Sequence, residues 1–358
     1  MAVEFHRLTV SDVRRETPEA VSIAFAVPPE LAGAYRFHPG QHITLRTQVN
    51  GHEVRRSYSI CTTPDDGELR IAVKRVEGGL FSTLANEAIK TGDLIDVMTP
   101  QGRFGVMLDP DAERHYVAIA AGSGITPVMS IIRAVLTDER RSRVTLIYGN
   151  RSTQSIIFRD QLEDLKDRFL RRLAVHHILS REAQEIALLD GRIDGRKLAA
   201  LLGTLPKNDI DVAFLCGPGG LIDEGRAALS AYGVPAERIH VEYFSADGTP
   251  VAARAAGAPV VAASAQETVA QITLNGARHD VPVRAGETII DAGLRAGLEM
   301  PYSCRGGMCC TCRAKLTVGA VTMDTNYSLE PWELEAGYVL TCQSHPTTPV
   351  VALDYDEV

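Results

Sequence analysis

The sequence predicts a three-domain chain: an antiparallel β-barrel over residues 1–107, an α/β domain with a parallel sheet over 108–245, and an α+β domain over 269–358. The length of 358 residues exceeds one ordinary domain. Near residue 114 closely spaced strands give way to alternating strands and helices. An Ala-, Gly- and Pro-rich segment, 246–268, is expected to be an interdomain linker.

The first domain contains six short runs rich in Val, Ile and Thr, each bounded by Pro, Gly, Asn or Asp, and one helical pattern, "FSTLANEAI". Six such strands in about 100 residues predict a small antiparallel barrel. The six runs are "LTVSDVRRE", "AVSIAFAV", "HITLRTQV", "VRRSYSI", "LRIAVKRV" and "DLIDVMTP".

The second domain opens with the apolar strand "HYVAIAA", a glycine loop and the helix "PVMSIIRAVL". Four more strands alternate with helices, among them "IIFRDQLEDLKDRF", which predicts a parallel sheet covered on both faces. The third domain begins "QITLNGARHDVPV", where Asn275-Gly276 between alternating apolar runs predicts a hairpin. The helix "TIIDAGLRAGL" and the strands "CRAKLTVG" and "VVALDYD" complete it.

Composition restricts the class of protein. Apolar residues make up 45% and charged residues 23%, as in soluble globular proteins, and the net charge of −8 argues against a nucleic-acid partner. The first residues, "MAVEFHRLTV", contain no apolar signal segment, and no apolar run is long enough to cross a bilayer. We therefore expect a cytoplasmic protein without a membrane partner, in which clustered cysteines serve as metal ligands or catalytic groups.

Four of the seven cysteines lie within nine residues, "CRGGMCCTC". Cys304, Cys309 and Cys312 have the spacing C-x4-C-x2-C, and Cys342 follows thirty residues later. This is the plant-type spacing of [2Fe–2S] ligands, so these four cysteines are predicted to hold such a cluster. A zinc site or thiol redox chemistry is the alternative, but zinc sites normally pair two C-x2-C motifs.

Three other residues of this loop have expected roles. Gly306 and Gly307 let the backbone fold closely around inorganic sulfide and direct N–H groups toward it. Cys310 is left over and is expected to be a small thiol that binds no iron.

"PYSCRGGMCCTCRAKL" and "VLTCQSHP" resemble a plant-type ferredoxin, which implies a β-grasp domain. "RSYSI", "AAGSGITPV" and "CGP" resemble the ferredoxin–NADP reductase superfamily. The domain order resembles the reductase components of bacterial multicomponent oxygenases, in particular those of phenylacetyl-CoA epoxidase systems, where "VKRV-GGLFST" and "YGNR" recur. The resemblance covers nearly the whole chain except the linker.

The resemblance implies an NAD(P)H-dependent oxidoreductase that passes electrons from NADPH through FAD and [2Fe–2S] to an oxygenase component, as in phenylacetate degradation. A reductase for a Rieske aromatic-ring or steroid hydroxylase is an alternative within the same class. A redox-sensing iron–sulfur protein that binds a partner without sustained turnover is an alternative of another class.

In "RSYS", Arg56 and Tyr58 share one face of a strand. Arg56 can pair with the flavin pyrophosphate and Tyr58 can stack on the isoalloxazine ring. The resemblance implies that Ser59 forms a hydrogen bond near flavin N5. The alternative for this motif is a surface arginine beside a half-buried tyrosine.

"VKRVEGGLFST" places Gly78 and Gly79 before a helix, whose first N–H groups can bind a phosphate. The resemblance adds Val73, Lys74 and Ser82 to this site and implies FAD rather than FMN.

"AAGSGITPV" follows a strand and opens a helix, as a dinucleotide-binding loop requires. Gly122, Gly124 and Pro127 match the G-x-G-x-x-P form of the reductase superfamily, and Thr126 would face the nicotinamide. Where a carboxylate would bind the ribose of NADH, the next strand ends in Asn150 and Arg151.

Arg151, with Arg159 as a second candidate, could pair with a 2′-phosphate, so NADPH is expected. The alternative is a solvated Arg151 and NADH as coenzyme.

Cys216, Gly217 and Pro218 end a parallel strand, the usual ligand edge of such a sheet. The resemblance implies that Cys216 lies near the nicotinamide and that Phe244 covers the flavin. Cys216 could instead be an ordinary small buried residue, and Cys61 has no assigned role.

Acidic residues are concentrated near the predicted cluster. Residues 269–358 contain eleven acidic and six basic residues, and residues 1–245 contain thirty-two and thirty. The excess either keeps the protein soluble or forms a docking face for a basic patch on the oxygenase. From 316 to 358 there is no Lys or Arg, and the acids are Asp324, Glu330, Glu333, Glu335, Asp354, Asp356 and Glu357.

Overall fold

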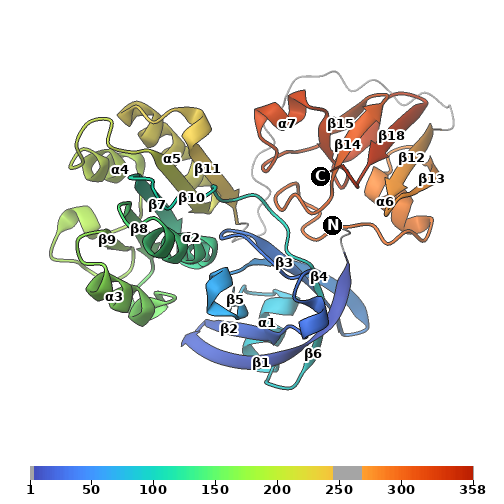
Figure 1. Ribbon diagram of the computed structural model, residues 1–358. Helices are drawn as coiled ribbons and strands as arrows, with labels where there is room; N and C mark the ends of the chain where they lie inside the picture. Colours follow the sequence, from blue (N-terminus) through green and yellow to red (C-terminus); the bar gives the residue numbers. More distant parts are fainter. Residues whose placement is uncertain (1–3, 245–267, 358) are drawn as a thin grey trace. The chain divides into compact units, whose positions relative to one another are not determined.

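A computed structural model describes residues 4–244 and 268–357 of the chain (Figure 1). One compact unit holds most of a β-barrel and a parallel sheet, and a second holds the C-terminal α+β domain together with Glu4 and Arg55–Ser57. The predicted linker, 246–268, lies outside the described residues except for Thr268, which begins a strand. Among the helices of these residues, none is long and apolar enough to span a membrane.

The barrel is a six-stranded sheet with the strand order β4-β3-β6-β1-β2-β5. A bridge between Ile60 and Ile71 joins the residue after β4 to β5 and closes the sheet, as predicted. Its interior is filled by aliphatic side chains such as Ile23, Ile43 and Val97. The strands are β1 (Phe5–Thr17), β2 (Ala20–Ala26), β3 (His42–Val49), β4 (His52–Ser59), β5 (Leu69–Lys74) and β6 (Leu94–Met98), with the helix α1 (Leu80–Glu87) after β5.

The second domain is a five-stranded parallel sheet with the order β11-β10-β7-β8-β9. Alternate residues of β7 face opposite sides: Tyr116 and Ala118 pack with α2, whereas Val117 and Ile119 pack with α4 and α5. Its strands are β7 (His115–Ala121), β8 (Arg143–Asn150), β9 (Leu173–Leu179), β10 (Val212–Gly217) and β11 (Ile239–Tyr243), and its helices are α2 (Ile125–Asp138), α3 (Arg159–Arg168), α4 (Gly195–Leu202) and α5 (Gly219–Tyr232).

Helix α3 begins three residues later than the pattern "IIFRDQLEDLKDRF" predicts. Ile157 and Phe158 are instead buried against the α2 side of the sheet, and Phe158 has a left-handed backbone with φ of 62°. Tertiary burial of these two side chains therefore overrides the helical pattern at its start.

The C-terminal domain has a five-stranded sheet, β13-β12-β18-β14-β16, in which β12 and β18 are parallel and the other pairs antiparallel. Asn275 and Gly276 have φ of 52° and 74°, which confirms the predicted hairpin. The elements are β12 (Thr268–Leu274), β13 (Ala277–Val283), α6 (Ile289–Arg295), β14 (Arg313–Val318), β15 (Val321–Met323), α7 (Pro331–Glu335), β16 (Tyr338–Leu340), β17 (Ser344–Pro346) and β18 (Val350–Asp354).

Four elements of this domain were not predicted: β15, β16, β17 and α7. Each has only three to five residues, too few to show a period of 2 or 3.6. Short 3₁₀ turns complete the description at Pro29–Leu31, Pro64–Asp66, Gly122–Gly124, Thr153–Ser155, Ala187–Leu189 and Ala236–Arg238.

Candidate redox site

Strand β4 carries the residues of the "RSYS" motif. Arg56 is exposed, Tyr58 is half-buried, and Ser59 is buried at the end of the strand. The ring of Tyr58 lies 5.4 Å from that of Phe81, the second residue of α1. An aromatic face and a guanidinium group therefore lie on the same side of one strand, as flavin binding requires.

The turn between β5 and α1 contains the residues predicted to bind a phosphate. Gly78 has φ of 71°, and a Cβ on Gly79 would lie 2.5 Å from Ser82 Oγ. Ser82 Oγ accepts a hydrogen bond from Val76 N, and this bond fixes the turn. The turn thus fits a phosphate group, because it leaves the first N–H groups of α1 without side chains in front of them.

Two residues of β5 differ in orientation. Val73 is fully buried in the barrel core, so only its backbone can contact a cofactor. Lys74 is half-buried, and its Nζ would lie 3.3 Å from a Cβ added to Gly122. The structure therefore brings this ammonium group from the barrel to the glycine loop of the second domain.

The glycine loop is a short 3₁₀ turn that leads directly into α2. Gly122 has φ of 54°, and a Cβ on Gly124 would lie 2.1 Å from Cys216 O, so only glycine fits there. Thr126 is buried, and its hydroxyl donates to Ser123 O at 3.0 Å. Pro127 is the third residue of α2, where its missing N–H costs no hydrogen bond.

The end of β8 carries Asn150 and Arg151. Asn150 is buried, and within the described residues its side-chain nitrogen and oxygen have no hydrogen-bond partner, which fits a site for a polar ligand. Arg151 is half-exposed, and its Nη1 lies 3.7 Å from Glu19 Oε2 on the barrel. Arg159 pairs with Glu163 on its own helix at 3.3 Å.

The end of β10 brings together the predicted "CGP" residues. Cys216 is fully buried, Gly217 has φ of 155°, and Pro218 precedes α5. Phe244 donates its backbone N–H to Gly217 O at 2.9 Å and packs against the same core as Cys216. Burial raises the pKa of the Cys216 thiol well above its usual value, so this thiol is neutral near pH 7.

A carboxylate that was not predicted from the sequence completes this group. Glu242 pairs with Cys216 in the parallel register of β11 and β10. Ser59 Oγ donates to Glu242 Oε2 at 3.1 Å, and Cys216 Sγ lies 4.0 Å from the same oxygen. Burial raises the pKa of Glu242 to about 7. The signal in the sequence was a single acid in the strand "IHVEYF", whose end lies at the ligand edge of the sheet.

The four predicted iron ligands form two pairs. A hydrogen bond from Cys309 to Cys304 and N–H groups of Gly306 and Met308 lower the pKa of Cys304 to about 6. A hydrogen bond from Cys312, opposed by burial, lowers the pKa of Cys342.

The backbone also directs donors at these sulfurs. Gly306 N lies 3.3 Å and Met308 N 3.4 Å from Cys304 Sγ. Gly307 has φ of 74°, and Cys310, which has φ of 53°, is partly buried. Preformed N–H donors to thiolate sulfur are a property of iron–sulfur loops.

The pairing distinguishes the two metal hypotheses. Cys304 interacts with Cys309, and Cys342 interacts with Cys312, so the four thiols lie as two pairs. A zinc site needs four ligands around one ion, whereas a plant-type cluster needs four thiolates for two irons. The residues therefore fit a [2Fe–2S] cluster.

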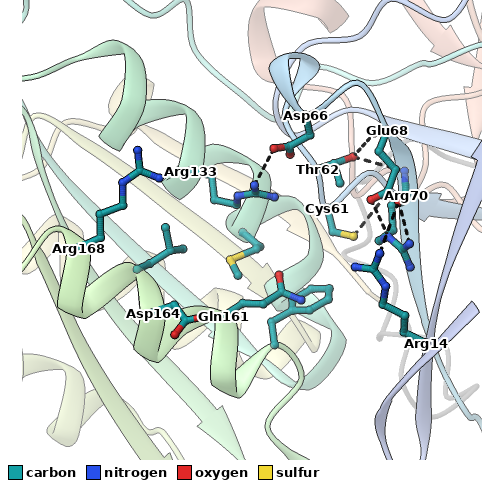
Figure 2. Close-up of a pocket in the computed structure, with 13 residues that line it drawn as sticks. Arg14, Cys61, Thr62, Asp66, Glu68, Arg70, Arg133, Gln161, Asp164 and Arg168 are labelled. Carbon is teal, nitrogen blue, oxygen red and sulfur yellow. Dashed lines mark hydrogen bonds and ion pairs between the residues drawn. The ribbon is translucent and has the colours of Figure 1, made fainter. Parts of the chain in front are cut away.

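A cavity of about 570 Å³ lies elsewhere in the first unit, where the barrel faces α2 and α3 (Figure 2). None of the predicted flavin, nucleotide or iron residues lines it. Four of its charged side chains form ion pairs, Arg133 with Asp66 at 2.7 Å and Arg70 with Glu68 at 2.8 Å. Cys61 borders the cavity, and burial raises the pKa of its thiol far above the usual range.

Comparison with known proteins assigns all three domains. Residues 8–105 match an oxidoreductase FAD-binding domain, residues 118–226 an oxidoreductase NAD-binding domain, and residues 272–347 a 2Fe-2S iron-sulfur cluster binding domain. Phthalate dioxygenase reductase, a solved structure 24% identical with a TM-score of 0.60, has the same fold over 98% of both chains.

Two curated relatives are similar over almost their whole length. One of the subunits of 1,2-phenylacetyl-CoA epoxidase from Escherichia coli K12 is 48% identical over 98% of both chains. The ferredoxin reductase component of 3-ketosteroid-9-alpha-monooxygenase from Rhodococcus rhodochrous is 34% identical over 97% of this chain and 96% of its own. The chain therefore belongs to the family of reductase components of multicomponent oxygenases, NAD(P)H-dependent oxidoreductases that carry FAD and a [2Fe–2S] cluster.

Proposed function

We propose that this reductase supplies electrons to the oxygenase component of a phenylacetyl-CoA epoxidase. The observation that carries the proposal is the 48% identity to a component of that enzyme over 98% of both chains. A 3-ketosteroid monooxygenase is the second candidate acceptor system, supported by the 34% identity to its reductase component.

Reconstitution tests the proposal. The full chain would be mixed with the oxygenase component of each system, and NAD(P)H oxidation would be measured with and without phenylacetyl-CoA or the ketosteroid. We expect substrate-dependent oxidation and epoxide formation only with the phenylacetyl-CoA system. Coupling to the steroid system alone would contradict the proposal, and reduction of a small artificial acceptor would show that the reductase itself is intact.

We propose that the flavin lies against β4 and the turn before α1. Arg56 would bind its pyrophosphate, Tyr58 would stack on its ring, and Ser59 would contact the reacting edge. The flavin, when bound, supplies hydride acceptance and one-electron transfer. The other residues proposed for this site are Val73 through its backbone, Lys74, Gly79, Ser82 and Phe244.

We propose that Ser59, Cys216 and Glu242 form the group around the site of hydride transfer. Glu242 orients the Ser59 hydroxyl through their 3.1 Å hydrogen bond. A carboxyl group with a pKa of about 7 can hold or release a proton at Oε2 near neutral pH. Cys216, a neutral thiol, would limit how closely the nicotinamide approaches and exclude water.

The pyridine nucleotide is proposed to bind at the carboxyl edge of the parallel sheet. The loop residues Gly122, Gly124 and Pro127 would contact its phosphates, with Thr126, Gly217 and Pro218 beside the nicotinamide. NADPH is the proposed coenzyme, with Arg151 as the partner of its 2′-phosphate. The ion pair of Arg151 with Glu19 is long and half-exposed, so a phosphate can replace the carboxylate at little cost.

The proposed boundaries of the domains are 1–107, 108–245 and 269–358, and the proposed iron ligands are Cys304, Cys309, Cys312 and Cys342.

The predicted acidic docking face needs one correction. Glu333, one of the seven acids of residues 316–358, is fully buried and cannot belong to a docking face.

We propose helix α7 as the part of the C-terminal domain that meets the oxygenase. The burial of its side chains is the reverse of the usual one, in which apolar residues are buried and charged ones exposed. Glu333 is buried, whereas Trp332 is 57% and Leu334 43% exposed. Glu330 and Glu335 lie on either side of these apolar residues along the chain. A partner with an apolar socket and a basic rim fits this surface, and residues 1–245, with nearly balanced charges, offer no such excess of bases.

A further inference from the structure

A buried ion pair involves the residue that follows the cysteine loop in the chain. Arg313 follows the ligand Cys312 in the chain, and its Nε lies 2.8 Å from Oε1 of Glu333 on α7. The side chain of Arg313 is 9% exposed and that of Glu333 is fully buried. The hydrophobic core of this domain is made of aliphatic and aromatic side chains and cysteines, and its other buried polar side chains, such as Thr311, Thr341 and Gln343, are uncharged.

Both partners are held in place by further contacts. The guanidinium carbon of Arg313 lies 3.6 Å from the centre of the Tyr338 ring, and Arg313 N donates to Cys310 O at 3.0 Å. The second oxygen of Glu333 accepts from Glu330 N at 3.0 Å and so caps α7. The pair therefore joins the cluster loop to α7.

Strand β14, which begins at Arg313, also pairs with β16, and the fourth ligand follows β16 in the chain. Arg313 lies opposite Leu340 in the β14–β16 ladder. Thr341 donates to Cys312 O through its backbone N–H at 3.1 Å and its hydroxyl at 2.9 Å. Arg313 is thus the first residue of the strand that registers the Cys312 segment against the Cys342 segment.

A buried ion pair contributes little net stability, because both charges lose their water, and apolar residues of similar size often serve as well. A fixed charge beside an iron–sulfur centre, in contrast, changes its reduction potential, since reduction adds one negative charge to the centre. The other charge pair of the loop, Arg305 with Asp291, is about half-exposed and is screened by water.

We propose that Arg313 and Glu333 together set the reduction potential of the [2Fe–2S] centre. Arg313, nearer to the ligands in the chain, stabilises the reduced centre, and Glu333 cancels part of that effect while it holds the guanidinium in place. The inference rests on the cysteine ligands proposed above, and it does not depend on which oxygenase accepts the electrons.

The test measures the midpoint potential of the full-length, iron-loaded protein by a reductive titration followed by electron paramagnetic resonance. Glu333→Gln keeps the size of the side chain and removes its charge, so the uncompensated arginine should raise the potential. We expect roughly a tenfold change in the reduction equilibrium, which is about 59 mV for one electron. The matched control is Glu335→Gln, two residues away on the exposed face, which should shift the potential far less.

A second variant keeps the proposal testable if Glu333→Gln does not fold. Arg313→Met combined with Glu333→Leu replaces the pair by apolar groups and should lower the potential below that of the natural protein. Equal shifts in Glu333→Gln and Glu335→Gln, or an unchanged potential in the double variant, would overturn the proposal.

Loss of iron in both Glu333→Gln and the double variant, with the apoprotein folded by circular dichroism, would assign the pair a purely structural role and also overturn the proposal. Loss of iron after Cys309→Ser alone would leave the ligand assignment intact, which separates the two inferences.

Discussion

The two proposed redox sites of this protein are assembled in opposite ways. Three of the four proposed iron ligands lie within nine residues, and the fourth lies in the turn between β16 and β17. The Ser59–Cys216–Glu242 group joins residues separated by up to 183 positions from two different sheets. A site built from one loop is visible as a spacing, whereas a site built from distant strands becomes visible only when the sheets are folded.

The two sites also differ in whether their surroundings favour the charged or the neutral form of their side chains. In the cysteine loop, N–H donors to Cys304 Sγ favour the thiolate that iron requires. At the other site, burial keeps the Cys216 thiol neutral and raises the pKa of Glu242 to about 7. The cysteine loop thus stabilises a thiolate that stays negatively charged, whereas the second site contains a carboxyl group, Glu242, that can gain and lose a proton near neutral pH.

The largest expected effect is at the cysteine loop. Cys309→Ser should abolish iron binding and the visible absorbance of the cluster, because one of four thiolates is lost. Cys310→Ser, its neighbour, should retain both and is the matched control. Iron content and absorbance of the purified variants check this, and the reverse result would refute the ligand assignment.

The next effect concerns the long-range site. Glu242→Gln should lower the rate of flavin reduction by NAD(P)H by about 10²-fold, the usual contribution of one acid–base group. Stopped-flow measurement of flavin bleaching gives this rate. An unchanged rate would show that Glu242 has only a structural role.

The same variant should be stabilised at neutral pH. The pKa of Glu242 is raised by folding from 4.5 to about 7, so its contribution to stability is complete below pH 4.5 and is lost as the pH rises toward 7. The melting temperature of the flavin-containing unit should therefore fall more steeply with pH in the natural protein than in Glu242→Gln. Parallel pH profiles would mean that this carboxyl group titrates normally.

Flavin retention tests the role of Arg56, the exposed residue of the proposed flavin site. Arg56→Ala should bind flavin roughly 10–150-fold more weakly, because a charge-assisted contact contributes about 1.5–3 kcal/mol. Flavin remaining after desalting is the measurement, and phosphodiesterase treatment of the released flavin checks that it is FAD. Full retention would remove Arg56 from the site.

Coenzyme choice should depend on a smaller, exposed interaction. Arg151→Ala should raise KM for NADPH roughly two- to fivefold and leave that for NADH nearly unchanged, since half-exposed pairs are weak. Glu19→Gln, which frees Arg151, should change KM in the opposite direction. Equal effects on both coenzymes would show that Arg151 does not recognise the 2′-phosphate.

The smallest effect is expected at α7. Neutralising Glu330 and Glu335 together should slow electron delivery to the oxygenase at low salt, and 0.15 M salt should have the same effect because the Debye length shortens from about 30 Å at 0.01 M to about 8 Å. Reduction of a small uncharged acceptor should remain constant and is the control. If neither the double substitution nor the higher salt changes the rate of electron delivery to the oxygenase, these acids serve only to keep the protein soluble.

Much of this protein could be read from the sequence because its signals are local. The alternation of strands and helices, the Asn275-Gly276 hairpin and the C-x4-C-x2-C spacing each depend on residues close in the chain. Short elements such as α7, and the late start of α3 after the buried Phe158, could not be read, because tertiary burial rather than propensity decides them.

By itself the sequence determined the domain order, the parallel sheet, the glycine loop and the cysteine spacing from which the iron ligands are predicted, since backbone geometry and ligand chemistry restrict those residue types and spacings. Only the tertiary structure decided that Glu242 faces Ser59 and that Glu333 is an internal partner of Arg313 rather than a surface charge. The reason is physical: the effect of a carboxylate depends on which groups surround it and how much water it has lost, and both are set by segments far away in the chain.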